Sequence, residues 1–180
     1  MEEAKSLRFD LGDLRRFLVG AKKATYANDD KGFEVSDREK ERSGHREFLY
    51  TDEEFPGFSY RDSYTGQDQF AGSEVVRLGT RPIWVMNYFG SRPMHDREHP
   101  RAFSASRIAL KSALLKAPEE APFRGPTYPL ALVTDYGVPT VYNNVVEGDI
   151  KRFRGRETVH VCDVLMHELE YFGGLILQRH

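Results

Sequence analysis

The chain has 180 residues, a formal net charge of -2, 39% hydrophobic residues and 30% charged residues. This length suits one domain or two small ones, and the mixed charge does not indicate a basic face for nucleic acid. A single cysteine, Cys162, excludes an intrachain disulfide. No apolar run reaches the roughly 18 residues of a membrane span, and the charged start lacks the apolar core of a signal peptide. We therefore expect a cytoplasmic protein without direct nucleic-acid or membrane partners.

The first predicted element is an amphipathic helix near the N-terminus. Apolar residues recur there at helical spacing: Leu14, Phe17, Leu18 and Ala21. Asp10 or Asp13 is a plausible N-cap. The charged stretch 28–46 that follows is predicted to be a mobile loop.

Short segments rich in aromatic and β-branched residues come next and predict strands. They cover residues 46–52, 57–66, 73–79 and 82–90. After a linker at 91–103, a second helix is predicted from a capping Ser104 to the residue before Pro118. Further strand segments then cover residues 130–137, 139–148, 157–162 and 164–174.

Two stretches of the chain match each other, which indicates an internal duplication. They are "FAGSEVVRLGTRPIWVMNYFG", residues 70–90, and "FRGRETVHVCDVLMHELEYFG", residues 153–173. Both read F-x-G-x-E-x-V and later Y-F-G. We therefore predict an α+β protein of two tandem pseudo-symmetric units, each a helix plus an antiparallel sheet of about four strands. The units would span 1–92 and 93–180 and pack into one compact domain.

The residues shared by both stretches most simply serve the fold. The glycines Gly72 and Gly155 are expected at a turn or bulge that opens a strand, and Gly90 and Gly173 at a strand end. The tyrosines Tyr88 and Tyr171 are expected to pack inward and to send each hydroxyl group to a polar partner.

Glu74 and Glu157 share strand faces with valines, so each carboxylate must be hydrogen-bonded or have a raised pKa. The first interpretation is structural, with each glutamate bonded to backbone N–H groups or a tyrosine of its own unit. A second places both at one cavity as a catalytic acid and base. A third leaves them exposed at a sheet edge.

Functional residues are expected where the two stretches differ. The first copy has more aromatic and polar side chains, a mixture that suits a small-molecule pocket. The candidates for such a pocket are Tyr60, Asp62, Tyr64, Trp84 and Asn87, with His167 in the second copy at the position of Trp84. Arg124, in the turn "RGP", is either a partner of a glutamate or a ligand anchor. Ordinary core and surface roles for all of these remain the alternative.

The sequence gives little indication of a metal site, a nucleophilic cysteine or a cofactor site. "HDREH", residues 95–99, contains possible metal ligands, but a solvated linker is the preferred interpretation. Cys162 lies at a predicted turn near His160, without a legible base or oxyanion hole. No nucleotide-binding fingerprint is present, so neither a metal nor a cofactor is expected.

The motifs "YRDSYTGQDQFAGSEVV", "PIWVMNYFG", "FRGP" and "GDIKRFRGRETV" occur in an order that resembles a bacterial family, domain of unknown function 5680. Some relatives carry an XRE-type helix-turn-helix ahead of this domain; here the first predicted helix is followed by the charged stretch and not by a short turn and a recognition helix, so none is expected. The resemblance implies ligand sensing or contact with a regulator protein, and no established activity. The residues it nominates are Asp62, Tyr64, Glu74, Trp84, Asn87, Tyr88, Arg124 and Glu157.

Three functions follow as hypotheses. The leading one is a non-enzymatic binding or sensing module for a small ligand or a protein partner. The second is a hydrolase-type enzyme that uses Glu74 and Glu157 as its paired acid and base. The third is a structural protein that forms a homodimer through its sheet edges.

Overall fold

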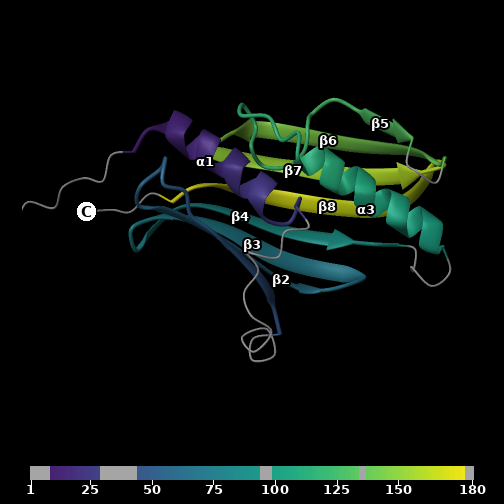
Figure 1. Cartoon of the computed structure of the whole chain (residues 1–180), viewed down its shortest axis with the longest axis horizontal. Helices are drawn as coiled ribbons and strands as arrows, with labels where there is room; N and C mark the ends of the chain where they lie inside the picture. The colour runs from purple at the N-terminus through teal and green to yellow at the C-terminus, as the bar shows by residue number, and fades with distance from the viewer. Residues whose placement is uncertain (1–8, 29–43, 94–98, 134–136, 177–180) are drawn as a thin grey trace, which may run out of the picture.

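The computed structural model describes residues 9–28, 44–93, 99–133 and 137–176. Within these ranges the chain forms two helices and a single eight-stranded antiparallel sheet (Figure 1). The elements in chain order are α1 (Leu11–Ala24), β1 (Arg46–Tyr50), β2 (Phe58–Gly66), β3 (Gln69–Leu78), β4 (Arg81–Ser91), α3 (Pro100–Leu114), β5 (Leu130–Val133), β6 (Pro139–Asp149), β7 (Arg152–Val161) and β8 (Val164–Leu175).

The strand order is β1-β2-β3-β4-β8-β7-β6-β5. The antiparallel strands are confirmed, but the prediction of two tandem units, each with its own sheet of about four strands, is wrong. β4 pairs with β8, with Trp84 opposite Leu175 and Ser91 opposite Glu168, and this pairing joins the two halves into one sheet. The physical reason is that each last strand would otherwise present a row of unpaired N–H and C=O groups. Pairing them with each other satisfies both rows.

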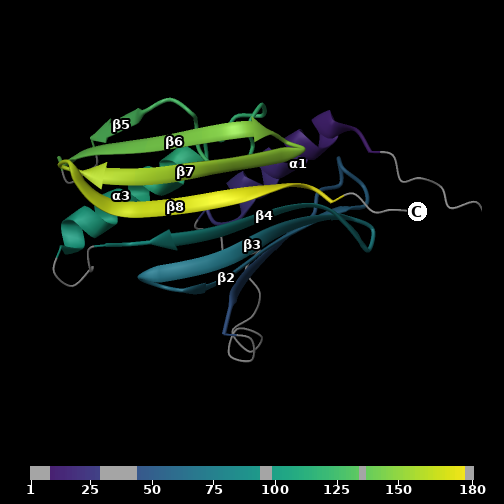
Figure 2. The same ribbon diagram turned by 180° about the vertical axis from the view of Figure 1, so that it is seen from behind.

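Both helices cover the same face of the sheet, as the two opposite views show (Figures 1 and 2). The predicted cap of α1 is confirmed at Asp10, whose carboxylate accepts hydrogen bonds from the amides of Gly12 and Asp13. The predicted start of the second helix at Ser104 is wrong. α3 begins at Pro100, inside the expected linker, because proline fits the first turn of a helix.

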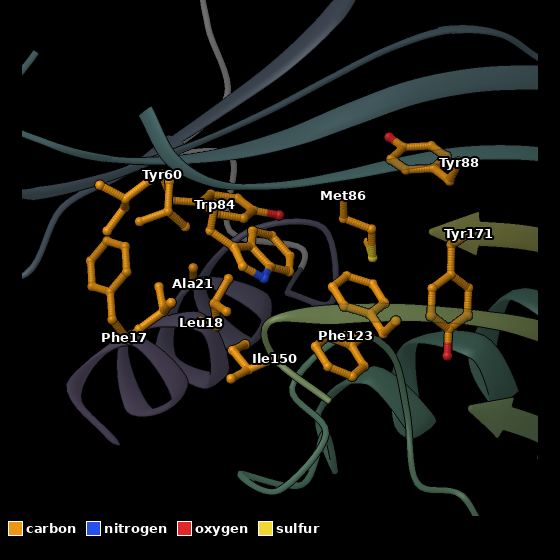
Figure 3. Close-up of a cluster of buried hydrophobic side chains, with 14 of the residues drawn as sticks. Phe17, Leu18, Ala21, Tyr60, Trp84, Met86, Tyr88, Phe123, Ile150 and Tyr171 are labelled. Atoms are coloured by element: carbon orange, nitrogen blue, oxygen red, sulfur yellow. The ribbon is translucent and has the colours of Figure 1, made fainter. Parts of the chain in front are cut away.

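The core between α1 and the sheet is aromatic and draws on both halves of the chain (Figure 3). Phe17 of α1 lies 5.3 Å from Phe58 of β2, measured between ring centroids. Trp84 of β4 stacks on Phe153 of β7 at 5.6 Å, and Phe153 stacks on Phe123 at 3.7 Å. Because first-half and second-half rings stack directly, the hydrophobic core belongs to the whole sheet.

The repeated glycines Gly72 and Gly155 lie inside strands, so their predicted places at a turn or bulge are wrong. Gly90 and Gly173 lie one and two residues before the ends of β4 and β8, near the predicted strand ends. A Cβ atom on Gly72 would lie 2.4 Å from the ring of Tyr88, and one on Gly90 would lie 2.3 Å from the ring of Phe70. These positions are glycine because a ring atom of an aromatic residue on the neighbouring strand occupies the space that a Cβ atom would need. Gly155 lies under the ring of Tyr171 in the same way.

The turn between β7 and β8 is where the sequence predicted it. It consists of Cys162 and Asp163, with φ angles of 47° and 65°. Cys162 is a free, exposed cysteine. None of the described helices is long and apolar enough to cross a membrane.

Candidate functional site

A pocket of about 870 Å³ lies on the helix-covered face of the sheet. Strands β1, β2, β4 and β8 provide side chains to its walls, together with β3 at Phe70 and α3 at Phe103, Arg107, Leu110 and Lys111. Residues outside these elements also line the pocket, among them Tyr26, which follows α1, Arg92, which follows β4, and Arg124, which follows α3. The pocket is therefore built mainly on the first half of the sheet and closed by the helix of the second half.

Two groups of aromatic rings line the pocket. In one, Phe48 and Tyr64 stack at 6.4 Å with an interplanar angle of 13°, and Tyr26 meets both rings edge to face. In the other, the Arg92 guanidinium contacts both Phe70 and Phe103, and its central carbon is 5.5 Å from each ring centroid. These walls offer flat apolar surface to a planar molecule.

Cationic side chains outnumber acidic ones in the lining. The cationic residues are Arg46, Arg92, Arg107, Lys111 and Arg124, and the acidic ones are Asp62 and Asp68. Within the part of the chain that the structure describes, no carboxylate forms an ion pair with Arg92 or Arg107. Such cations attract anions, and a confined pocket strengthens that attraction.

Asp62 and Tyr88 form the polar floor of the pocket. The Tyr88 hydroxyl donates a 2.7 Å hydrogen bond to Oδ1 of Asp62, which is only 5% exposed. Burial and the nearby charge of Glu74 raise the pKa of Asp62 to about 7, against the opposing effects of the Tyr88 bond and Lys22. Asp62 therefore changes its charge near neutral pH.

Arg124 and His167 form a second polar wall, and both contact the carboxylate of Glu157, which lies outside the pocket lining. Arg124 binds Glu157 through two hydrogen bonds, 3.1 Å from Nε and 2.7 Å from Nη2. Nε2 of His167 lies 3.1 Å from Oε1 of the same carboxylate, and the Tyr142 hydroxyl donates to Oε2 at 2.7 Å. Burial alone would raise the pKa of Glu157, but Arg124 and His167 lower it well below its usual range. Glu157 is therefore a buried anion that fixes these side chains.

His167 also presents an unused polar atom. The residue is 3% exposed, it lines the pocket, and its Nδ1 has no hydrogen-bond partner among the described residues. The ring stacks on Phe70 at 5.8 Å. Buried polar atoms are rarely left without a partner, so His167 marks a place where a bound molecule can supply one.

The first half contains a matching buried ion pair. Lys22 of α1 bonds both carboxylate oxygens of Glu74, and both side chains are buried. Burial lowers the pKa of Lys22, and the charge of Glu74 opposes that shift. Neither Glu74 nor Glu157 lines the pocket. Each glutamate is held by a cation within its own half of the sheet.

The structure divides the predicted ligand-binding residues into three groups. Five line the pocket: Asp62, Tyr64, Tyr88, Arg124 and His167. Tyr60 and Trp84 are 2% and 0% exposed and belong to the core beneath α1. Asn87 alternates with the inward-facing Met86 and Tyr88 and so lies on the opposite face of the sheet.

Several pocket residues were not foreseen from the sequence. Arg92 falls in the expected linker, and Phe103 was also assigned to it. Arg107 and Lys111 lie four residues apart on α3, which places them on one side of that helix, and this spacing was a usable signal. A lysine four residues after Leu18, on the apolar side of α1, was the corresponding signal for a buried ion pair at Lys22.

The weaker candidates do not join this site. Residues 94–98, which include most of the possible metal ligands of "HDREH", and residues 29–43 of the predicted loop lie outside the described residues. Arg46, at the end of that loop, belongs to β1. Among the described residues there is no cluster of three or more His, Cys, Asp or Glu side chains that could hold a metal ion.

The fold and the pocket define an α+β protein with one eight-stranded antiparallel sheet, two helices on one face and a basic, aromatic-lined pocket on that same face. The chain belongs to the family described as a domain of unknown function, DUF5680, whose model matches residues 62–176. The match begins at Asp62 in the pocket floor and extends past the end of β8. No curated protein and no solved structure matches the chain.

Proposed function

We propose that the chain is a non-enzymatic binding module that takes a small organic anion with a planar apolar part into this pocket. The observation that carries the proposal is Arg92. Its guanidinium packs against the rings of Phe70 and Phe103, lines the pocket and has no acidic partner in the described part of the chain. A cation kept in this way is available to a carboxylate or phosphate.

The remaining lining supports the same class of ligand. Arg107 of α3 adds a second cation without an acidic partner among the described residues. The stacked pair of Phe48 and Tyr64 offers a flat surface for an apolar ring. Asp62 and His167 provide a few polar atoms at depth, which is the usual composition of a small-molecule site.

The geometry disfavours the hydrolase alternative in the form that uses Glu74 and Glu157. A general acid and base must reach the same substrate. Here the carboxylate of Glu74 is bonded to Lys22 and that of Glu157 to Arg124, and neither lines the pocket. Both carboxylates therefore support the binding module as buried structural anions.

The test is a thermal-shift and calorimetric screen of the full chain against aromatic acids and their neutral amides or esters. Acids are expected to raise the melting temperature, since a ligand that binds only the folded state stabilises it. Their affinity should fall as salt is added, because salt screens charge–charge attraction. Arg92→Gln and Arg107→Gln should each weaken binding.

Arg154→Gln is the matched control, because Arg154 is an exposed arginine that pairs with Glu147 and is absent from the pocket lining. Its binding of acids should equal that of the unmodified chain. The proposal is wrong if no acid shifts the melting temperature, or if Arg92→Gln and Arg154→Gln bind alike.

A further inference from the structure

Asp62 and Asn144 occupy matching places in the two halves of the sheet. Asp62 lies directly opposite Glu74 in the β2–β3 pairing, and Asn144 lies directly opposite Glu157 in the β6–β7 pairing. Each side chain accepts a 2.7 Å hydrogen bond from a tyrosine on the last strand of its half. The main chemical difference is that one side chain is a carboxyl group and the other is an amide.

The second half shows what occupies the space next to this side chain. Nδ2 of Asn144 donates a 2.8 Å hydrogen bond to the carbonyl oxygen of Gly125. The amide of Gly125 in turn donates to the Tyr142 hydroxyl at 2.9 Å. A Cβ atom on Gly125 would lie 2.6 Å from that hydroxyl, so the backbone fills the space closely.

The corresponding space in the first half is open. The ion pairs of the two halves correspond, because Lys22 holds Glu74 as Arg124 holds Glu157. The backbone contact does not correspond: among the described residues, no backbone group bonds to the Asp62 side chain in the way that the Gly125 carbonyl bonds to Asn144. Among the described residues the hydrogen bond from Tyr88 is the only one that Asp62 receives. Asp62 lines the pocket, so its second oxygen is left for a bound molecule.

Building on the proposed function, we propose that the bound acid carries an amide N–H that donates a hydrogen bond to Oδ2 of Asp62. The ligand would lie where the Gly125 carbonyl lies beside Asn144, with the direction of the hydrogen bond reversed. The reversal follows because a carboxylate accepts at the position where an asparagine amide donates. Small acids that combine a carboxylate, an amide N–H and a planar apolar group, such as N-acylated amino acids, fit Arg92, Asp62 and the aromatic walls together.

The experiment compares two probes that differ in one atom, N-benzoylglycine and its ester analogue O-benzoylglycolic acid. Calorimetry on the full chain at about pH 8 is expected to show the amide binding about tenfold more tightly or better, because the ester leaves Asp62 without its partner. Equal affinity for the two probes would overturn the inference and leave the proposed function standing. If neither probe binds, the inference fails, and the wider screen of acids decides the proposed function separately.

A variant locates the effect at Asp62. Asp62→Asn retains an acceptor for the Tyr88 hydroxyl, as Asn144 does for Tyr171, so the fold is expected to survive. It also turns a donor toward the ligand N–H, so the preference for the amide over the ester should disappear. Asp149→Asn, at an exposed turn, should keep the preference. An undiminished preference in Asp62→Asn would contradict the assignment.

Discussion

Tyr88 and Tyr171 lie directly opposite each other on β4 and β8, and their hydroxyl groups point away from one another (Figure 3). Each ring crosses a glycine on the neighbouring strand, and each hydroxyl donates a 2.7 Å hydrogen bond one strand further out, to Asp62 or to Asn144. The two halves of the sheet thus repeat one arrangement about this central pair. They differ in what covers it, because Gly125 closes the second half and the pocket lies over the first.

Gly72→Ala is expected to destabilise the fold by about 1–3 kcal/mol, as overpacking of a tightly packed interior does. The new methyl group would lie 2.4 Å from the Tyr88 ring and 2.7 Å from a backbone oxygen, that of Ser63. Urea unfolding measures the loss. Ser73→Ala, on the opposite face of the same strand, should change stability little, and equal effects of the two variants would contradict the packing described.

Glu157→Gln is expected to cost about 3–5 kcal/mol, because it leaves Arg124 buried without a counter-charge. Arg124 is 7% exposed and Glu157 is fully buried. Chemical denaturation gives the free energy of unfolding. Arg154→Gln breaks an exposed ion pair with Glu147 and should have little effect. A comparable loss of stability in both variants would show that the buried ion pair contributes no more to stability than the exposed one.

Asp62→Asn is expected to change the dependence of stability on pH. A carboxyl group whose pKa is raised from 3.8 to about 7 takes up a proton on folding, so its contribution to stability is full below 3.8 and is lost as the pH rises through 7. As the pH rises from 4 to 8, the free energy of unfolding of the variant should therefore increase relative to that of the unmodified chain by about 1–4 kcal/mol. Thermal unfolding across this range measures the gain, with Asp149→Asn as the control. A constant difference between variant and parent would argue against the raised pKa.

The fragments 1–92 and 93–180 are expected to be unfolded alone and to fold when mixed. Each would expose the edge of β4 or β8 and lose stacking partners, since Trp84 packs on Phe153 across the two halves. Circular dichroism of each fragment and of the equimolar mixture tests this. A fragment that folds cooperatively by itself would restore the picture of two independent units.

The sequence alone was enough to predict the local features of this protein. The helical spacing of Leu14, Phe17 and Leu18 and the cap at Asp10 depend on neighbours along the chain, and the structure confirms them. The inward packing of Tyr88 and Tyr171 toward polar partners also followed from their place on the strands. That the two halves arose by duplication stays a prediction.

Only the tertiary structure decided how these parts are used. Pairing of β4 with β8 depends on contacts between residues far apart in the chain, which local patterns do not encode. The same holds for Arg92, which appeared to be a linker residue and becomes a pocket wall because the fold brings both Phe103 of α3 and Phe70 of β3 against its guanidinium. Glu74 and Glu157 were recognisable as buried carboxylates from their strand faces, but their partners Lys22 and Arg124 come from segments that only the folded sheet brings to them.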